Sequence, residues 1–92
     1  MSVPPKYARG VRFRRLADGS GVLLVPEGVV KLSETAASIA ELVDGARTPA
    51  EIATALAVQF DARPDAIATD VAGLLRDFAR KTWLESETPG PA

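Results

Sequence analysis

The chain has 92 residues, of which 47 % are hydrophobic and 25 % are charged, which is typical of one small folded domain and not of a disordered segment. It contains no cysteine and no histidine, which excludes a disulfide framework, a cysteine-histidine zinc site, a thiol nucleophile and a serine-histidine pair. The net charge of -1 combines a basic segment, 1–32, with an acidic remainder, 33–92.

The chain carries no targeting signal that we can identify. Its first residues lack the apolar run of a signal peptide, and no later run approaches the ~18 residues that a membrane span needs. A chain without cysteine also suits a reducing compartment. We therefore expect a soluble, cytoplasmic protein with an N-terminal arm at 1–8, a folded domain at 9–84 and a flexible tail at 85–92.

Three short strands are predicted in the first third of the chain. Residues 11–16 read VRFRRL and nearly alternate apolar and basic side chains, as in a strand with one face in water. The glycine-rich segment 17–21 supplies a turn. The second and third strands are predicted at 22–25 and 29–32, separated by a turn at Pro26 because proline cannot donate to a sheet ladder.

A helical period begins at Ser33, which is a good N-cap. This first helix is expected to run up to Gly45, which can take the left-handed conformation that stops a helix. A second helix is predicted from the capping pair Thr48 and Glu51, with proline at its first position. Its apolar positions, Ile52, Leu56 and Phe60, recur at four-residue spacing.

A third helix is predicted from Pro64 as far as Arg80 and Lys81, followed by the apolar pair Trp83 and Leu84. Three strands followed by three helices predict an α+β domain, small and winged-helix-like. A small sheet of this kind leaves an edge strand with unpaired N–H and C=O groups, which is a surface on which another chain can pair.

Four segments resemble a known family when they are taken in order: RGVRFRR, GVLLVPEGVVKL, ETAASIAELVDGARTPAEI and the pair Asp70-Val71. The chain resembles, from about Arg9 to Leu84, the PqqD family of peptide chaperones in bacterial pyrroloquinoline quinone (PQQ) biosynthesis. Through this family it resembles the recognition elements of ribosomally made, modified peptides (RiPPs).

The resemblance implies a chaperone without catalytic activity or cofactor. Such proteins bind a precursor peptide and deliver it to a radical S-adenosylmethionine (SAM) enzyme, which joins a glutamate and a tyrosine side chain of that peptide. In the family the peptide adds as a strand beside the third strand, in a groove whose other wall is the third helix. Carried over to this chain, the peptide-binding residues are Val29, Val30, Lys31 and Leu32 on the strand and Asp70, Leu74 and Asp77 on the helix.

Two positions depart from the family pattern. Gly28 stands where similar proteins often carry a larger and frequently basic residue, which puts a charge contact at this position in doubt. Thr82 stands where a glycine often ends the third helix. Because threonine disfavours positive φ, we expect this helix to end differently.

Each expected site residue also has a plain structural interpretation. Leu74 is more typical of the core than of a ligand contact. The two aspartates are equally suited to a solvated or capping position, and Val29 and Val30 could simply complete the sheet. The basic segment from Arg9 to Arg15 could be only a water-facing strand face, or could attract an acidic precursor or enzyme surface.

Two other function classes stay open at this point. A winged-helix DNA-binding protein would use the third helix for recognition, but the N-terminal half of that helix is acidic where phosphate contacts are expected. A metal enzyme could use Asp61, Asp65 and Asp70, but carboxylates at these spacings do not share one helical face.

The short connection formed by Pro26, Glu27 and Gly28 bears on assembly. Short, strained hinges favour the exchange of a hairpin between two copies. We therefore expect a monomer or a domain-swapped homodimer.

Overall fold

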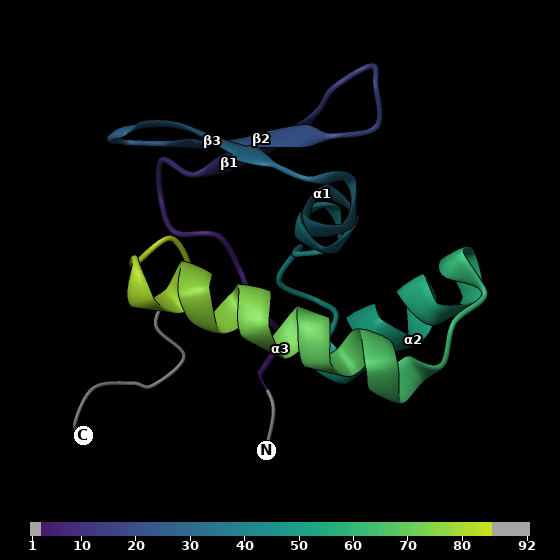
Figure 1. Ribbon diagram of the computed structural model, residues 1–92. Coiled ribbons are helices and arrows are strands. Elements are labelled where there is room, and N and C mark those ends of the chain that lie inside the picture. Colours follow the sequence, from purple (N-terminus) through teal and green to yellow (C-terminus); the bar gives the residue numbers. More distant parts are fainter. Residues whose placement is uncertain (1–2, 86–92) are drawn as a thin grey trace, which may run out of the picture.

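The computed structural model describes residues 3–85, so the expected tail lies outside the described residues except for Glu85. One antiparallel sheet of order β1-β2-β3 is followed by three helices (Figure 1), which confirms the predicted α+β fold. The elements are β1 (Arg12–Arg15), β2 (Gly21–Val25), β3 (Gly28–Leu32), α1 (Glu34–Glu41), α2 (Pro49–Phe60) and α3 (Pro64–Arg80). No helix within the described residues is long and apolar enough to cross a bilayer.

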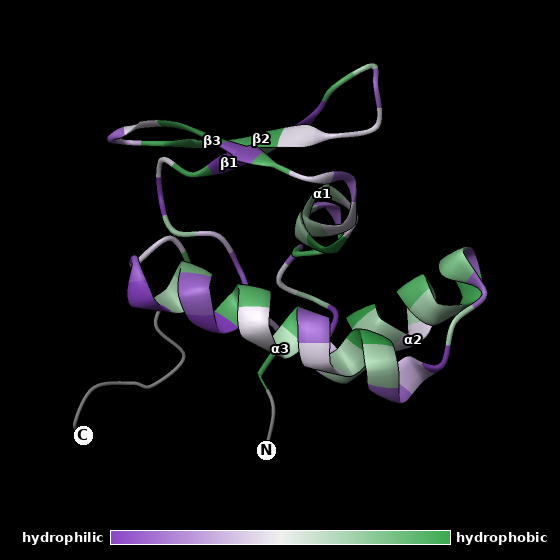
Figure 2. Cartoon of the chain, in the orientation of Figure 1, coloured by the Kyte–Doolittle hydropathy of each residue, from purple (hydrophilic) through white to green (hydrophobic). Residues whose placement is uncertain are grey.

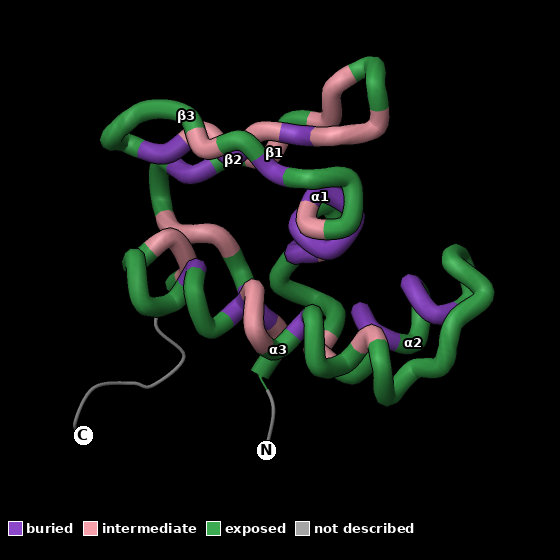
Figure 3. Tube along the Cα trace, in the orientation of Figure 1, coloured by how far each residue is buried: buried purple, intermediate pink, exposed green. Residues whose placement is uncertain are grey.

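The helices lie on one side of the sheet. Figure 1 shows α1 directly beneath the sheet, with α2 and α3 forming a further layer below it. Within residues 3–85, no helix or strand covers the other face of the sheet (Figure 3). The sheet therefore has one packed face and one face in solvent, as the alternating sequence of β1 predicts.

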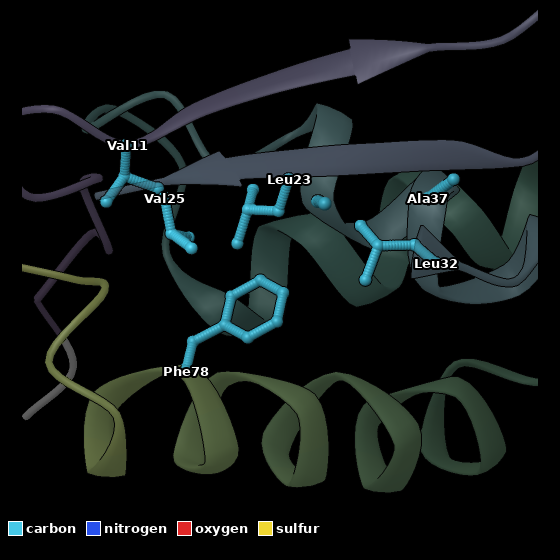
Figure 4. Packing of buried hydrophobic residues seen from close by; sticks show 7 residues of the cluster. Val11, Leu23, Val25, Leu32, Ala37 and Phe78 are labelled. Atoms are coloured by element: carbon cyan, nitrogen blue, oxygen red, sulfur yellow. The ribbon is translucent and has the colours of Figure 1, made fainter. Parts of the chain in front are cut away.

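The packed face forms the first part of the core. Along β2, Leu23 and Val25 are buried while Val22 and Leu24 are only partly covered, because successive side chains point to opposite faces. Phe78 rises from α3 toward Leu23 and Val25 (Figure 4). A second cluster joins the helices and consists of Ile39, Val43, Ile52, Ala53, Leu56, Val71 and Leu75.

The predicted helix starts are confirmed. The Ser33 hydroxyl accepts a hydrogen bond from the N–H of Ala36 at 3.2 Å. At α2, Thr48 Oγ1 accepts from the N–H of Glu51 at 3.2 Å, and the Glu51 carboxylate accepts from the N–H of Thr48 at 2.8 Å. These side chains satisfy backbone donors that the first turn of a helix leaves free.

The first helix ends earlier than predicted. It stops at Glu41, and Gly45 lies beyond it in a loop, where its N–H donates to the carbonyl of Pro5 at 2.9 Å. The reason lies in Asp44, whose carboxylate accepts from the N–H groups of Ala46 and Arg47 at 2.9 and 3.0 Å. Such a local side-chain to backbone turn competes with helix continuation, and these same bonds lower the pKa of Asp44.

The predicted apolar stripe of α2 is only partly buried. Ile52 and Leu56 are in the core, but Phe60 is 40 % exposed. Phe60 is the last residue of the helix, where fewer neighbours are available to cover it.

The end of α3 contradicts our expectation for Thr82. This residue does take a positive φ of 63°. Its N–H donates to the carbonyl of Ala79 at 3.0 Å, and the N–H of Trp83 donates to the carbonyl of Phe78 at 2.9 Å. These two bonds form a Schellman motif, and the rings of Phe78 and Trp83 pack 5.6 Å apart as its hydrophobic contact. The stabilising contacts therefore outweigh the conformational preference of threonine.

Residues near the N-terminus lie against the chain that follows α3. Tyr7 bridges Leu84 in antiparallel fashion, and the N–H of Ala8 donates to the carbonyl of Trp83 at 2.9 Å. The Tyr7 hydroxyl donates to the carbonyl of Ala40 at 2.6 Å. These contacts hold the Trp83 backbone in place at the end of the third helix.

Candidate functional site

β3 is an edge strand that pairs only with β2 among the described elements. The two strands are joined by the two-residue turn of Pro26 and Glu27, and Val25 pairs with Gly28. A turn of this length directs the N–H of the residue after it back toward the carbonyl of the residue before it. The N–H of Gly28 therefore points toward β2.

This first pair determines the direction of every later backbone group in β3. In an antiparallel ladder the N–H and C=O of successive residues point alternately to the two neighbouring sides. Val30 and Leu32 therefore direct their backbone groups toward β2. Val29 and Lys31 direct theirs away from the sheet, toward the open side. The sequence alone could not show which of these two sets of backbone groups faces outward, because that depends on the register between β2 and β3.

The side chains of β3 follow the same alternation between the two faces. Leu32 is buried and Val30 is partly buried and packs against the core. Val29 is 62 % exposed and Lys31 is also exposed, so both lie on the uncovered face.

The third helix stands opposite this edge without closing it. Within the described residues, no Cα atom of α3 lies within 8 Å of a Cα atom of β3. Hollows occur at both ends of β3. The first, of about 460 Å³, lies between the β2–β3 turn and the end of α3, and is lined by Val25, Glu27, Gly28, Val29, Val30, Lys81 and Trp83.

The second hollow, of about 290 Å³, begins just beyond Leu32. Its walls are the start of α1 and the middle of α3. It is lined by Ser33, Thr35, Ala36, Ile39, Thr69, Asp70, Gly73, Leu74 and Asp77.

The structure places the expected strand and helix residues at different ends of this edge. Val29 and Val30 line the first hollow, whereas all three expected helix residues, Asp70, Leu74 and Asp77, line the second. Lys31 and Leu32, which we also expected at the site, line neither.

The helix residues differ in how free they are to contact a ligand. Leu74 is partly buried and packs against both core clusters, so it has a structural role as well as a place in the wall. Asp77 forms an ion pair with Arg80 at 2.7 Å. Within residues 3–85, Asp70 has no cation within ion-pair distance.

Sequence reasoning missed several wall residues, among them Gly73, Lys81 and Trp83. Gly73 lies three residues after Asp70 and four before Asp77, and Lys81 lies four after Asp77, which are helical spacings that could have identified them. Trp83 follows the helix and lines the first hollow, where the Lys81 ammonium lies 5.4 Å from the centre of its ring. The first hollow thus combines an apolar wall with a cation.

Gly28 lies at the rim of the first hollow with a φ of 146°. A Cβ atom built here would meet no atom within 4 Å, so the backbone conformation, and not crowding, is what favours glycine.

The arrangement suits an extended ligand. It offers unpaired backbone groups along one edge and a hollow for side chains at each end of that edge. In the part of the chain that the structure describes, no cluster of three acidic side chains that could hold a metal ion occurs.

Comparison with known proteins identifies the family. Residues 20–84 match the family "Coenzyme PQQ synthesis protein D (PqqD)". The "PqqA binding protein" of Kluyvera intermedia is 38 % identical over 91 residues, covering 96 % of each chain. The protein of the same name from Azotobacter vinelandii is 42 % identical over 82 residues, covering 88 % of each.

A solved structure agrees with this assignment. The solution structure of the PqqD part of Methylobacterium extorquens PqqCD, described as a functional and stand-alone RiPP recognition element, is 37 % identical with a TM-score of 0.76. The similarity covers 89 % of this chain and 88 % of that one. This chain belongs to the PqqD family.

Proposed function

We propose that this chain is a non-catalytic peptide chaperone of PQQ biosynthesis, which binds the precursor peptide as an added β-strand and presents it to a radical SAM enzyme. The observation that carries the proposal is the open edge of β3, which faces α3 across a gap with a hollow at each end. Relatives with 38 to 42 % identity are named PqqA binding proteins.

Backbone pairing supplies the first part of the interaction. Val29 and Lys31 each offer one N–H donor and one C=O acceptor on the open side, so an added strand can form up to four hydrogen bonds with them. Each such bond contributes about 1 kcal/mol net. This contribution does not depend on the peptide's side chains.

Side chains supply the selectivity. Alternate residues of an added strand point to the same face and lie roughly 6.6 Å apart. Those on the packed face would point into the gap between β3 and α3, toward the hollows at its two ends. The first hollow offers Trp83 and Lys81, and the second offers Asp70 beside Leu74. An extended segment with apolar residues, a basic residue near Asp70 and an acidic residue near Lys81 fits this groove best.

The composition of the chain agrees with a role in binding. It has no histidine or cysteine, and a chaperone of this kind needs neither because the chemistry belongs to its enzyme partner. The DNA-binding alternative fits less well, because the α3 surface beside the edge presents Asp70 and Asp77.

A titration of isotope-labelled protein with the precursor peptide tests the binding. We expect the amide signals of Val29 and Lys31 to shift together with those of the α3 wall, and the fluorescence of Trp83, the only tryptophan, to change in parallel. A scrambled peptide is the control. Shifts confined to β1 or α2 would contradict the proposed site.

A turnover assay tests the chaperone role. The radical SAM enzyme should cross-link the peptide only, or much faster, when this chain is present. Equal cross-linking rates with and without the chain would contradict that role.

A further inference from the structure

The uncovered face of the sheet carries an ordered pattern of charge. Register places Arg12 beside Leu24 and Leu24 beside Val29, which makes one row across the three strands. The neighbouring row consists of Arg14, Val22 and Lys31. We call these six residues the outer sheet face.

The three cations of this face are available for binding. Arg12, Arg14 and Lys31 are all exposed, and within residues 3–85 none of them has a carboxylate within ion-pair distance. Asp18 and Glu27 lie in the turns that border the face. The Asp18 carboxylate already accepts hydrogen bonds from the N–H and hydroxyl of Ser20, at 2.9 and 2.6 Å.

An apolar strip runs between the cations. Val22 and Leu24 are partly covered and Val29 is 62 % exposed. Figure 2 shows the hydrophilic part of β1 next to the hydrophobic part of β2. Exposed apolar residues bordered by unpaired cations are typical of a surface that binds an acidic protein partner.

The position of this face relative to the β3 edge indicates the partner. A strand added beside β3 would extend the same sheet, and half of its side chains would lie in line with Val29 and Lys31 on the uncovered side. A protein docked on the outer sheet face would therefore contact the peptide as well.

We propose that the outer sheet face docks on an acidic, partly apolar surface of the enzyme that modifies the bound peptide. The identity of this partner rests on the proposed function, but the docking surface rests on the register and charges above. β1 lies two strands from the open edge, roughly 10 Å away at the usual strand spacing, so peptide binding and enzyme docking can be separated by mutation.

The test compares two double variants of equal net charge. Arg12→Glu/Arg14→Glu reverses the charge at two positions of the outer sheet face. Arg63→Glu/Arg76→Glu reverses the charge at two exposed positions of the helical layer and is the control. Affinity for the precursor peptide and for the radical SAM enzyme of the same pathway is measured for each, at low and high salt. Arg12→Gln/Arg14→Gln provides a milder change if the reversed variant does not fold.

We expect the face variant to bind peptide as the parent does, while its affinity for the enzyme falls about tenfold or more and loses most of its salt dependence. The control variant should keep both affinities. Unchanged enzyme affinity in the face variant would overturn the proposal, and so would an equal loss of peptide affinity.

Two further outcomes separate this proposal from others. If the parent binds anionic lipid vesicles or duplex DNA but not the enzyme, the face serves a different class of partner and the proposal is wrong. If the parent binds the enzyme through this face but does not bind the peptide, docking stands and the proposed function fails.

Discussion

Thr82 is held in a left-handed conformation that costs a non-glycine residue about 1 kcal/mol. The conformation persists because the Schellman bonds and the contact between Phe78 and Trp83 require it. Thr82→Gly should therefore raise the free energy of unfolding by about 1 kcal/mol, measured by denaturant titration. Thr82→Ala, which keeps the Cβ atom, is the control and should raise it much less. Equal stability of the glycine variant and the parent would contradict this account.

Tyr7 connects the N-terminal segment to α1, and its burial raises the pKa of its hydroxyl well above the usual value. The folded state then holds this proton more tightly than the unfolded state does. The contribution of Tyr7 to stability is therefore complete below pH ~10, the unfolded pKa, and is lost as the pH rises above it.

Ultraviolet absorbance of tyrosinate measures this directly, since Tyr7 is the only tyrosine. We expect no tyrosinate near pH 10 in the folded protein, and its appearance together with unfolding at higher pH. The Tyr7→Phe variant should have a free energy of unfolding about 1 kcal/mol lower than that of the parent at neutral pH, because it lacks this hydrogen bond. Its stability should fall less steeply than that of the parent as the pH rises. Titration of the folded parent near pH 10 would be inconsistent with a buried phenol.

At the scale of elements, α3 is both a part of the core and a wall of the proposed site. Gly73 lies in the middle of this helix and lines the second hollow, and a Cβ atom at this position would meet no atom within 4 Å. Gly73→Ala should stabilise the helix by ~0.5–1 kcal/mol and leave peptide affinity nearly unchanged.

A larger side chain at the same position should separate binding from folding. Gly73→Leu should also fold at least as stably as the parent, but its side chain would occupy the hollow and reduce peptide affinity about tenfold. Calorimetric titration with the precursor peptide measures the difference between the two variants. If Gly73→Leu binds as tightly as Gly73→Ala, the second hollow is not part of the peptide site.

The helix starts could be predicted because their signals are local. Ser33, Thr48 and Glu51 act on backbone groups within three residues, so the sequence alone contains the whole interaction. The end of α1 was mispredicted since two stop signals compete there, and the turn at Asp44 precedes the glycine. The end of α3 was mispredicted because the conformational preference of threonine was considered without the contact between Phe78 and Trp83, which completes a Schellman motif.

At the scale of the whole molecule, the order of strands and helices followed from hydrophobic periodicity, and the open edge followed from the size of the sheet. The division of the site into two hollows could not be predicted from the sequence. It depends on how far α3 stands from β3, and this distance is a result of packing by Leu74 and Phe78 between the layers. The family resemblance indicated that the edge of β3 binds the peptide. The register of the strands showed which backbone groups of β3 face the open side.

The central claim is that the peptide pairs with the outward backbone groups of β3. Proline removes one N–H donor, at a cost of about 1 kcal/mol or more per lost bond. Because Val30 bonds to β2, Val30→Pro should lower the free energy of unfolding. Val29→Pro and Lys31→Pro remove donors on the open side, so they should largely keep their stability.

The most direct test therefore measures both the free energy of unfolding and the peptide affinity of these three proline variants. Val29→Ala and Lys31→Ala are the controls, because they change the side chain but keep the N–H. We predict that Val29→Pro and Lys31→Pro fold but lose about tenfold or more in affinity relative to their alanine controls, while Val30→Pro is destabilised. If the two outward variants fold and bind the precursor as well as their controls do, the peptide does not add to this edge.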